Sequence, residues 1–142
     1  KTNAKSIIDF GCGKAMAYKQ KIEFNSITYP NIKNFWNINE ITLYDPGVPE
    51  FSNYPETPAD GIICTDVIEH ITPEDILKFI DELFLLSNKF LFFVIATKPA
   101  SKYFEDGRNI HLTLKSHNEW NLIFEDFKKK YPSLNIEVRF NE

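Results

Sequence analysis

The chain has 142 residues, 43% of them hydrophobic, so it is long enough for one buried core and too apolar to be disordered. Its formal net charge of −4 argues against an overall basic surface for nucleic acid. No apolar run reaches membrane-spanning length, no secretory signal opens the chain, and its two cysteines fit reduced thiols better than a disulfide framework. We therefore expect a single cytoplasmic domain over residues 1–142, without a membrane partner. Because the first strand begins almost at once, the domain is also expected to be trimmed at its amino end.

The first predicted element is a buried strand over residues 6–10 that ends in a glycine-rich loop. Two adjacent isoleucines make this strand β-branched and apolar, as a covered parallel strand requires. Gly11 and Gly13 permit a tight turn and let a ligand approach backbone atoms closely. A helix is predicted from residue 14 to about residue 22, whereas residues 25–39 predict no defined element. A strand, a glycine loop and a helix in this order typically bind a nucleoside-containing cofactor.

Two further strands are predicted in the middle of the chain, each ending at an aspartate. The first covers residues 41–44 and ends at Asp45. Several prolines make residues 47–58 a loop. The second strand covers residues 61–65, is buried, and ends at Asp66.

Two amphipathic helices are predicted in the second half of the chain. The first begins with Thr72 as its N-cap, and the second begins with a capping-box pattern at Ser116. Between them lie an apolar strand over residues 90–96 and a polar connection over residues 98–114. Alternating apolar and polar residues over 134–140 predict a last strand near a sheet edge.

The alternation of strands and helices predicts an α/β fold. We expect a three-layer αβα sandwich with a mostly parallel, Rossmann-like sheet and right-handed crossovers. Ligands in such sheets bind outside the carboxyl ends of the strands. The glycine loop, Asp45, Asp66 and Thr97 all follow predicted strands, so they are expected at one edge of the sheet.

The glycine loop distinguishes between two classes of cofactor. A dinucleotide fingerprint needs a small residue where Met16 stands and an acid about 20 residues further on, and Asp45 lies well beyond that spacing. The run instead matches D-x-G-x-G-x-A, formed by Asp9, Gly11, Gly13 and Ala15. This pattern resembles motif I of the class I S-adenosylmethionine (SAM) methyltransferases.

A second motif points to the same family. Residues 60–71, D-G-I-I-C-T-D-V-I-E-H-I, resemble the D-V-I/L-E-H segment of methyltransferases of the ubiquinone-biosynthesis type. The resemblance extends from residue 6 to about residue 120 and implies a SAM-dependent enzyme. It implies that the glycine loop holds the methionine part of SAM and that the carboxylate ending the second strand bonds the ribose hydroxyls. The implied cofactor-binding residues are Asp9, Gly11, Gly13, Asp45, Thr65 and Asp66.

Methyl transfer from SAM is an in-line displacement, so a general base is needed only when the acceptor must lose a proton. The candidate catalytic bases are His70 and His111, with a structural role for His70 left open. Asp66, Glu69 and the two histidines also resemble the E-x-x-E-H…H metal set of small-RNA 2′-O-methyltransferases. The leading assignment nevertheless contains no metal ligand.

The acceptor is expected to be a small molecule, and nucleic acid is not the expected partner of an acidic chain. Three alternatives stay open: a SAM-binding module without catalysis, a metal-assisted RNA 2′-O-methyltransferase, and another nucleic-acid methyltransferase. A basic patch formed by Lys98, Lys102 and Arg108 would favour the last of these. The sequence does not determine the oligomeric state.

Overall fold

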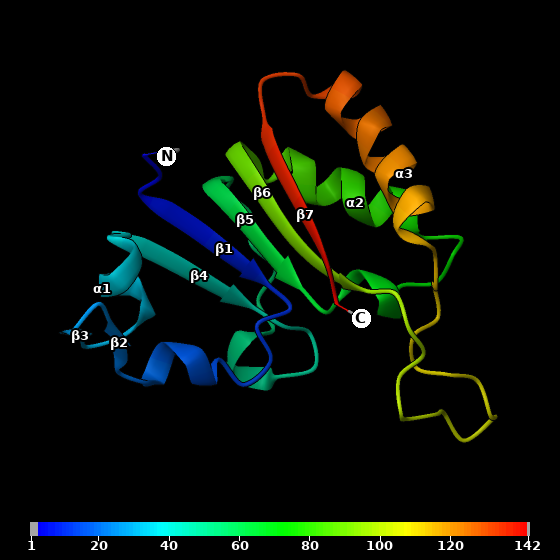
Figure 1. Ribbon diagram of the computed structural model, residues 1–142, viewed down its shortest axis with the longest axis horizontal. Helices are drawn as coiled ribbons and strands as arrows, with labels where there is room; N and C mark the ends of the chain where they lie inside the picture. The colour runs from blue at the N-terminus through cyan, green and yellow to red at the C-terminus, as the bar shows by residue number, and fades with distance from the viewer. Residues whose placement is uncertain (1–2, 142) are drawn as a thin grey trace.

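A five-stranded sheet forms the centre of the computed structural model, which describes residues 3–141. The strands are β1 (Ser6–Phe10), β4 (Glu40–Tyr44), β5 (Ala59–Thr65), β6 (Ser87–Ala96) and β7 (Asn135–Asn141). They lie in the order β4-β1-β5-β6-β7, and every neighbouring pair is parallel (Figure 1). The chain runs from β1 to β4 on one side and returns to β5 on the other. This reversal makes the carboxyl ends of β1 and β5 a topological switch point, where open α/β sheets bind ligands.

Helices α2 (Ile76–Leu85) and α3 (His117–Lys130) pack on one face of this sheet (Figure 1). Ile80, Leu83 and Phe84 of α2 recur at helical spacing and are fully buried against the strands. The predicted capping box at Ser116 starts α3. The Ser116 side chain accepts from the Glu119 N–H, and the Glu119 carboxylate accepts from the Ser116 N–H. The prediction of a mostly parallel α/β sheet is confirmed. No helix within residues 3–141 is long and apolar enough to cross a bilayer.

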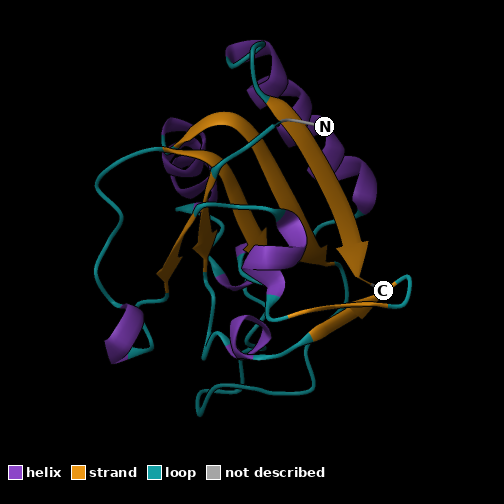
Figure 2. Cartoon of the chain, turned by 90° about the vertical axis from the view of Figure 1, so that its left-hand side faces the viewer, coloured by secondary structure: helices purple, strands orange, loops and turns teal. Residues whose placement is uncertain are grey.

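The helix predicted from residue 14 to residue 22 is wrong. A 3₁₀ turn, η1 (Met16–Lys19), stands there and is followed by β2 (Ile22–Phe24). Ala15 precedes the turn with a left-handed φ of 52°, and few apolar residues repeat at helical spacing beyond it. Residues 25–39, to which the sequence analysis assigned no element, contain β3 (Ile27–Tyr29) and α1 (Ile32–Trp36). The β2–β3 hairpin stands apart from the main sheet (Figure 2).

The predicted N-cap of the helix after β5 is also wrong. The structure begins α2 at Ile76, with Asp75 at the capping position. The Thr72 hydroxyl donates to Asp75 Oδ2 at 2.8 Å and so closes the turn that precedes the helix. The acids and the proline of this segment are typical of a helix start, but they form turns here.

The second face of the sheet holds a groove of about 1220 Å³. Residues of four strands line it, among them Ile7, Ile63 and Phe92, and Phe35 and Trp36 from α1 also line it. Within residues 3–141, the five-residue α1 is the only α-helix that borders this groove. The three-layer arrangement therefore stays a prediction.

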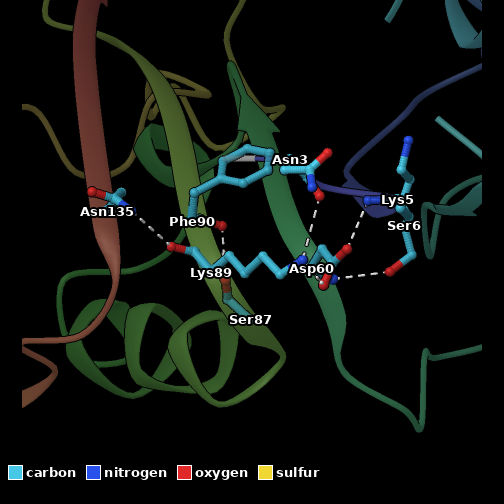
Figure 3. Close-up of polar contacts among 8 residues, drawn as sticks. All are labelled: Asn3, Lys5, Ser6, Asp60, Ser87, Lys89, Phe90 and Asn135. Carbon is cyan, nitrogen blue, oxygen red and sulfur yellow. Dashed lines mark hydrogen bonds and ion pairs between the residues drawn. The ribbon is translucent and has the colours of Figure 1, made fainter. Parts of the chain in front are cut away.

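The amino ends of β1, β5 and β6 are joined through Asp60 (Figure 3). One carboxylate oxygen accepts from the Lys5 N–H at 2.6 Å, and the other pairs with Lys89 Nζ at 3.1 Å. The Asp60 N–H donates to Ser6 Oγ at 2.9 Å. The Lys5 bond, followed by the Lys89 bond, lowers the Asp60 pKa from its ordinary value. This end of the sheet is thus fixed by polar contacts and lies opposite the carboxyl edge.

Gly61 allows Phe90 to lie flat over β5 on the open face (Figure 3). A Cβ at Gly61 would lie 2.0 Å from Cε1 of the Phe90 ring. The aromatic ring therefore fills the space of the missing side chain and makes glycine necessary here.

Candidate functional site

The loop after β1 lies at the carboxyl edge of the sheet and is fixed to β4. The N–H groups of Gly11 and Cys12 both donate to the Tyr44 carbonyl, at 2.7 and 3.0 Å. Gly11 has a φ of +88°, and a Cβ there would lie 2.2 Å from Val67 Cγ2. Gly13 has a φ of +54°, and a Cβ there would meet nothing within 4 Å. Gly11 is thus required for packing, whereas Gly13 leaves open space beside the backbone.

Asp45 lies directly against this loop, as the sequence predicted. Its Oδ2 accepts from the Gly13 N–H at 2.8 Å, and its Oδ1 accepts from the Gly47 N–H at 2.8 Å. The Asp45 N–H donates to the carbonyl of Phe51 at 2.9 Å, in the short turn η2 (Pro49–Phe51). Because a carboxylate has about four lone-pair positions, both oxygens keep capacity for ligand hydroxyls. Asp45 therefore joins the ends of β1 and β4 and offers acceptors at their edge.

Asp9 is held below the loop by a side chain that sequence reasoning missed. The Tyr18 hydroxyl, from η1, donates to Asp9 Oδ2 at 2.6 Å. Burial raises the pKa of Asp9 above its ordinary value, the Tyr18 bond opposes this, and the charge of Asp45 adds to it. Burial and the bond to Asp9 also raise the pKa of Tyr18. No sequence motif pointed to Tyr18, because it lies within residues 14–22, where a helix was expected.

Thr65 and Asp66 lie at the end of β5, where both also contact neighbouring strands on the side of β6 and β7. Thr65 pairs with Val94 in the parallel register. Asp66 has a left-handed φ of 55°, and its N–H donates to the Val94 carbonyl at 2.9 Å. Asp66 Oδ1 accepts from Asn141 Nδ2 at 2.7 Å, at the end of β7. The structure thus directs the Asp66 carboxylate toward β7, while Asp45 contacts the glycine loop.

The two predicted histidines come together, although they are far apart in sequence. His70 ends the short turn η3 (Ile68–His70), and its ring centroid lies 4.9 Å from that of His111. The Nδ1 atom of His70 lies 2.9 Å from the Ile110 carbonyl, and that of His111 lies 2.7 Å from the Lys98 carbonyl. Since a carbonyl only accepts, each Nδ1 donates, and each neutral ring keeps a lone pair on Nε2. Two basic nitrogens are therefore available at this edge.

Glu69 is fully buried beside the histidines. Its Oε1 accepts from the Ala96 N–H at 3.2 Å, whereas its Oε2 has no hydrogen-bond partner within the described part of the chain. Burial is the main cause that raises the Glu69 pKa. One ligand atom from each of Glu69, His70 and His111 lies within 4.8 Å of the others. Asp66, the fourth member of the resembled metal set, is not part of this cluster.

A hollow of about 350 Å³ adjoins His70 on the side of α2. Its lining includes Thr72, Asp75 and Phe79. The larger groove lies on the open sheet face and contains none of the predicted site residues. The smaller hollow is therefore the better placed of the two for chemistry at the carboxyl edge.

Neither family models, curated proteins nor solved structures give a match to this chain. Its function is therefore inferred from the geometry of the residues at the carboxyl edge of the sheet.

Proposed function

We propose that the chain is a SAM-dependent methyltransferase. The observation that carries the proposal is the contact between the Asp45 carboxylate and the Gly13 N–H at the carboxyl edge of β1 and β4. Asp45 keeps acceptor capacity for two adjacent ribose hydroxyls, and the space at Gly13 suits close approach of a ligand. The residues present therefore fit the cofactor that the sequence motifs imply.

Bound SAM would supply a methyl group on a sulfonium, ready for in-line displacement. Asp45 would hold the ribose, and the backbone from Gly11 to Gly13 would hold the methionine end. The hollow beside His70 has room for an acceptor group at the same edge. In the neutral form, with Nδ1 donating to a carbonyl, His70 and His111 would each offer Nε2 to remove a proton from an acceptor hydroxyl or amine. Alignment of the acceptor would supply most of the remaining rate enhancement.

Calorimetric titration with S-adenosylhomocysteine tests the cofactor assignment. We expect the native chain to bind it and Asp45→Ala to bind it roughly 10- to 100-fold more weakly, since hydrogen bonds to charged groups contribute about 1.5–3 kcal/mol. Asp106→Ala is the matched control, because it removes an exposed acid outside this site and should leave affinity unchanged. NAD should give no heat. Equal affinities for the two variants, or no binding by the native chain, would contradict the proposal.

A divalent cation at Glu69, His70 and His111 defines a second candidate, a metal-assisted methyltransferase of the RNA 2′-O type. Three potential ligand atoms within 4.8 Å and the unpartnered Glu69 Oε2 favour it. Both Nδ1 bonds to carbonyls leave Nε2 as the ligand atom of each ring, and such a bond on the other ring nitrogen is usual for metal-bound histidines. A bound cation would compensate the buried carboxylate and polarise an acceptor hydroxyl.

Titration with Mn²⁺ alone, followed by calorimetry, tests this cluster. We expect saturable binding by the native chain and its loss in Glu69→Gln and in His111→Ala, because each variant removes one of three ligands. His117→Ala, on α3, is the control histidine variant and should bind as the native chain does. No heat with the native chain would leave the two histidines as bases without a metal.

A further inference from the structure

An arm projects from the carboxyl edge beside the histidines. The arm, residues 98–115, follows β6 and extends away from the sheet (Figure 1). An antiparallel bridge joins Tyr103 and Asn109, and the Phe104 N–H donates to the Arg108 carbonyl at 2.8 Å. The tip is thus a turn closed by backbone contacts.

Asn109 fixes the base of the arm. Its Oδ1 accepts from the Ala100 N–H at 3.0 Å, and its Nδ2 donates to the Ala100 carbonyl at 2.8 Å. The same Oδ1 accepts from the His111 N–H at 2.9 Å, while His111 Nδ1 reaches the Lys98 carbonyl. The base of the arm is therefore fixed next to the histidine pair.

Two adjacent aromatic side chains are exposed on the arm. Tyr103 is 62% exposed and Phe104 is 44% exposed. The Arg108 guanidinium lies 5.6 Å from the centroid of the Phe104 ring, which places a cation at the same surface. Apolar rings displayed on a fixed turn beside a candidate active site offer flat faces for stacking.

The arm is one of the basic segments of an acidic chain. It carries four cations and two acids, a net charge of +2, whereas the whole chain carries −4. One of the acids, Asp106, already pairs with Arg108 at 2.8 Å. Lys98 and Lys102 precede the aromatic pair in sequence, Arg108 follows it, and Lys115 closes the segment. This charge distribution is complementary to a polyanion that lies along the arm.

We propose that the arm binds single-stranded nucleic acid. Unstacked bases would lie on Tyr103 and Phe104, and phosphates would lie near Lys98 and Lys102. A duplex does not suit this surface, because its bases are already stacked on one another. The inference rests on the proposed methyltransferase function and names its acceptor, in place of the small molecule expected from the net charge.

Fluorescence anisotropy with labelled oligothymidine and oligouridine tests the inference. We expect binding by the native chain and at least about a tenfold loss for the Tyr103→Ala, Phe104→Ala double variant, since stacking contributes about 1–3 kcal/mol per base. Lys102→Ala should reduce the salt dependence of binding, with a slope smaller by about 1. Leu122→Ala, at an exposed apolar position of α3, is the matched control and should bind as the native chain does.

Three outcomes would overturn the inference: no oligonucleotide binding at low salt, undiminished binding by the double variant, or preference for a duplex. Titration of the same samples with S-adenosylhomocysteine separates this inference from the proposed function. Cofactor binding without oligonucleotide binding would overturn the acceptor class alone. Oligonucleotide binding without cofactor binding would support the arm as a binding surface and overturn its role in presenting a methyl acceptor.

Discussion

Gly11→Ala is expected to destabilise the chain by about 2–5 kcal/mol and to abolish cofactor binding. Two costs combine, because the new Cβ would lie 2.2 Å from Val67 Cγ2 and the residue would keep a left-handed φ of +88°. Overpacking of this kind costs about 1–3 kcal/mol, and a strained backbone conformation costs about the same. Urea unfolding followed by circular dichroism measures the first effect, and titration with S-adenosylhomocysteine measures the second.

Gly107→Ala supplies the matched control for Gly11→Ala. Gly107 has a similar φ of +84°, but a Cβ there would meet nothing within 4 Å. It should therefore show the backbone cost without the clash and keep cofactor binding. Adding Val67→Ala to Gly11→Ala should recover part of the lost stability, since it removes the clashing methyl groups. If Gly11→Ala costs no more than Gly107→Ala, the packing argument for Gly11 is wrong.

Trp120→Ala is expected to cost about 3–5 kcal/mol, the typical cost of removing a large aromatic side chain from a core. Trp120 is fully buried on α3 and packs in the core beside Phe124. Its Nε1 has no hydrogen-bond partner among the residues that the structure describes. Trp120→Phe should consequently cost much less, because it keeps a ring and removes a buried donor. Urea unfolding of both variants measures the difference.

Leu122→Ala serves as the control for the Trp120 variants, because Leu122 lies on the same helix and is 54% exposed. Leu122→Ala should change the free energy of unfolding by less than about 1 kcal/mol. Equal losses for Trp120→Phe and Trp120→Ala would mean that the indole N–H makes an important contact, and would contradict this account.

Much of the sheet could be predicted from the sequence, because its strands carry strong local signals. β1 and β5 are largely apolar, and they are followed by Gly11 and Asp66. A glycine or an aspartate directly after an apolar run indicates the carboxyl end of a buried strand. The elements between residue 14 and residue 39 were missed, because the hairpin and the short helix pack through aromatic contacts that no helix or strand periodicity marks. Phe35, for example, packs its ring 5.3 Å from Phe24 and 5.2 Å from Tyr29.

The candidate site was predictable where strand ends determine it. Asp45 and Gly13 follow neighbouring strands, so topology alone brings them together. The partners of the other residues depend on side-chain packing that no motif encodes. Asn141 reaches Asp66 across 75 residues of sequence. The burial of Glu69 with one unpaired oxygen is likewise a property of the assembled core.

The position of β1 inside the sheet also has a consequence for the speed of folding. β1 is made first, yet its neighbours are β4 and β5, and the bond from Asp60 to Ser6 spans 54 residues. A sheet built from such distant parallel pairs has high contact order, so its folding is slow for a domain of this length. During synthesis the isoleucines of β1 stay unpaired until β4 has been made, and their second neighbour, β5, is complete only at residue 65. This interval exposes an apolar strand to aggregation.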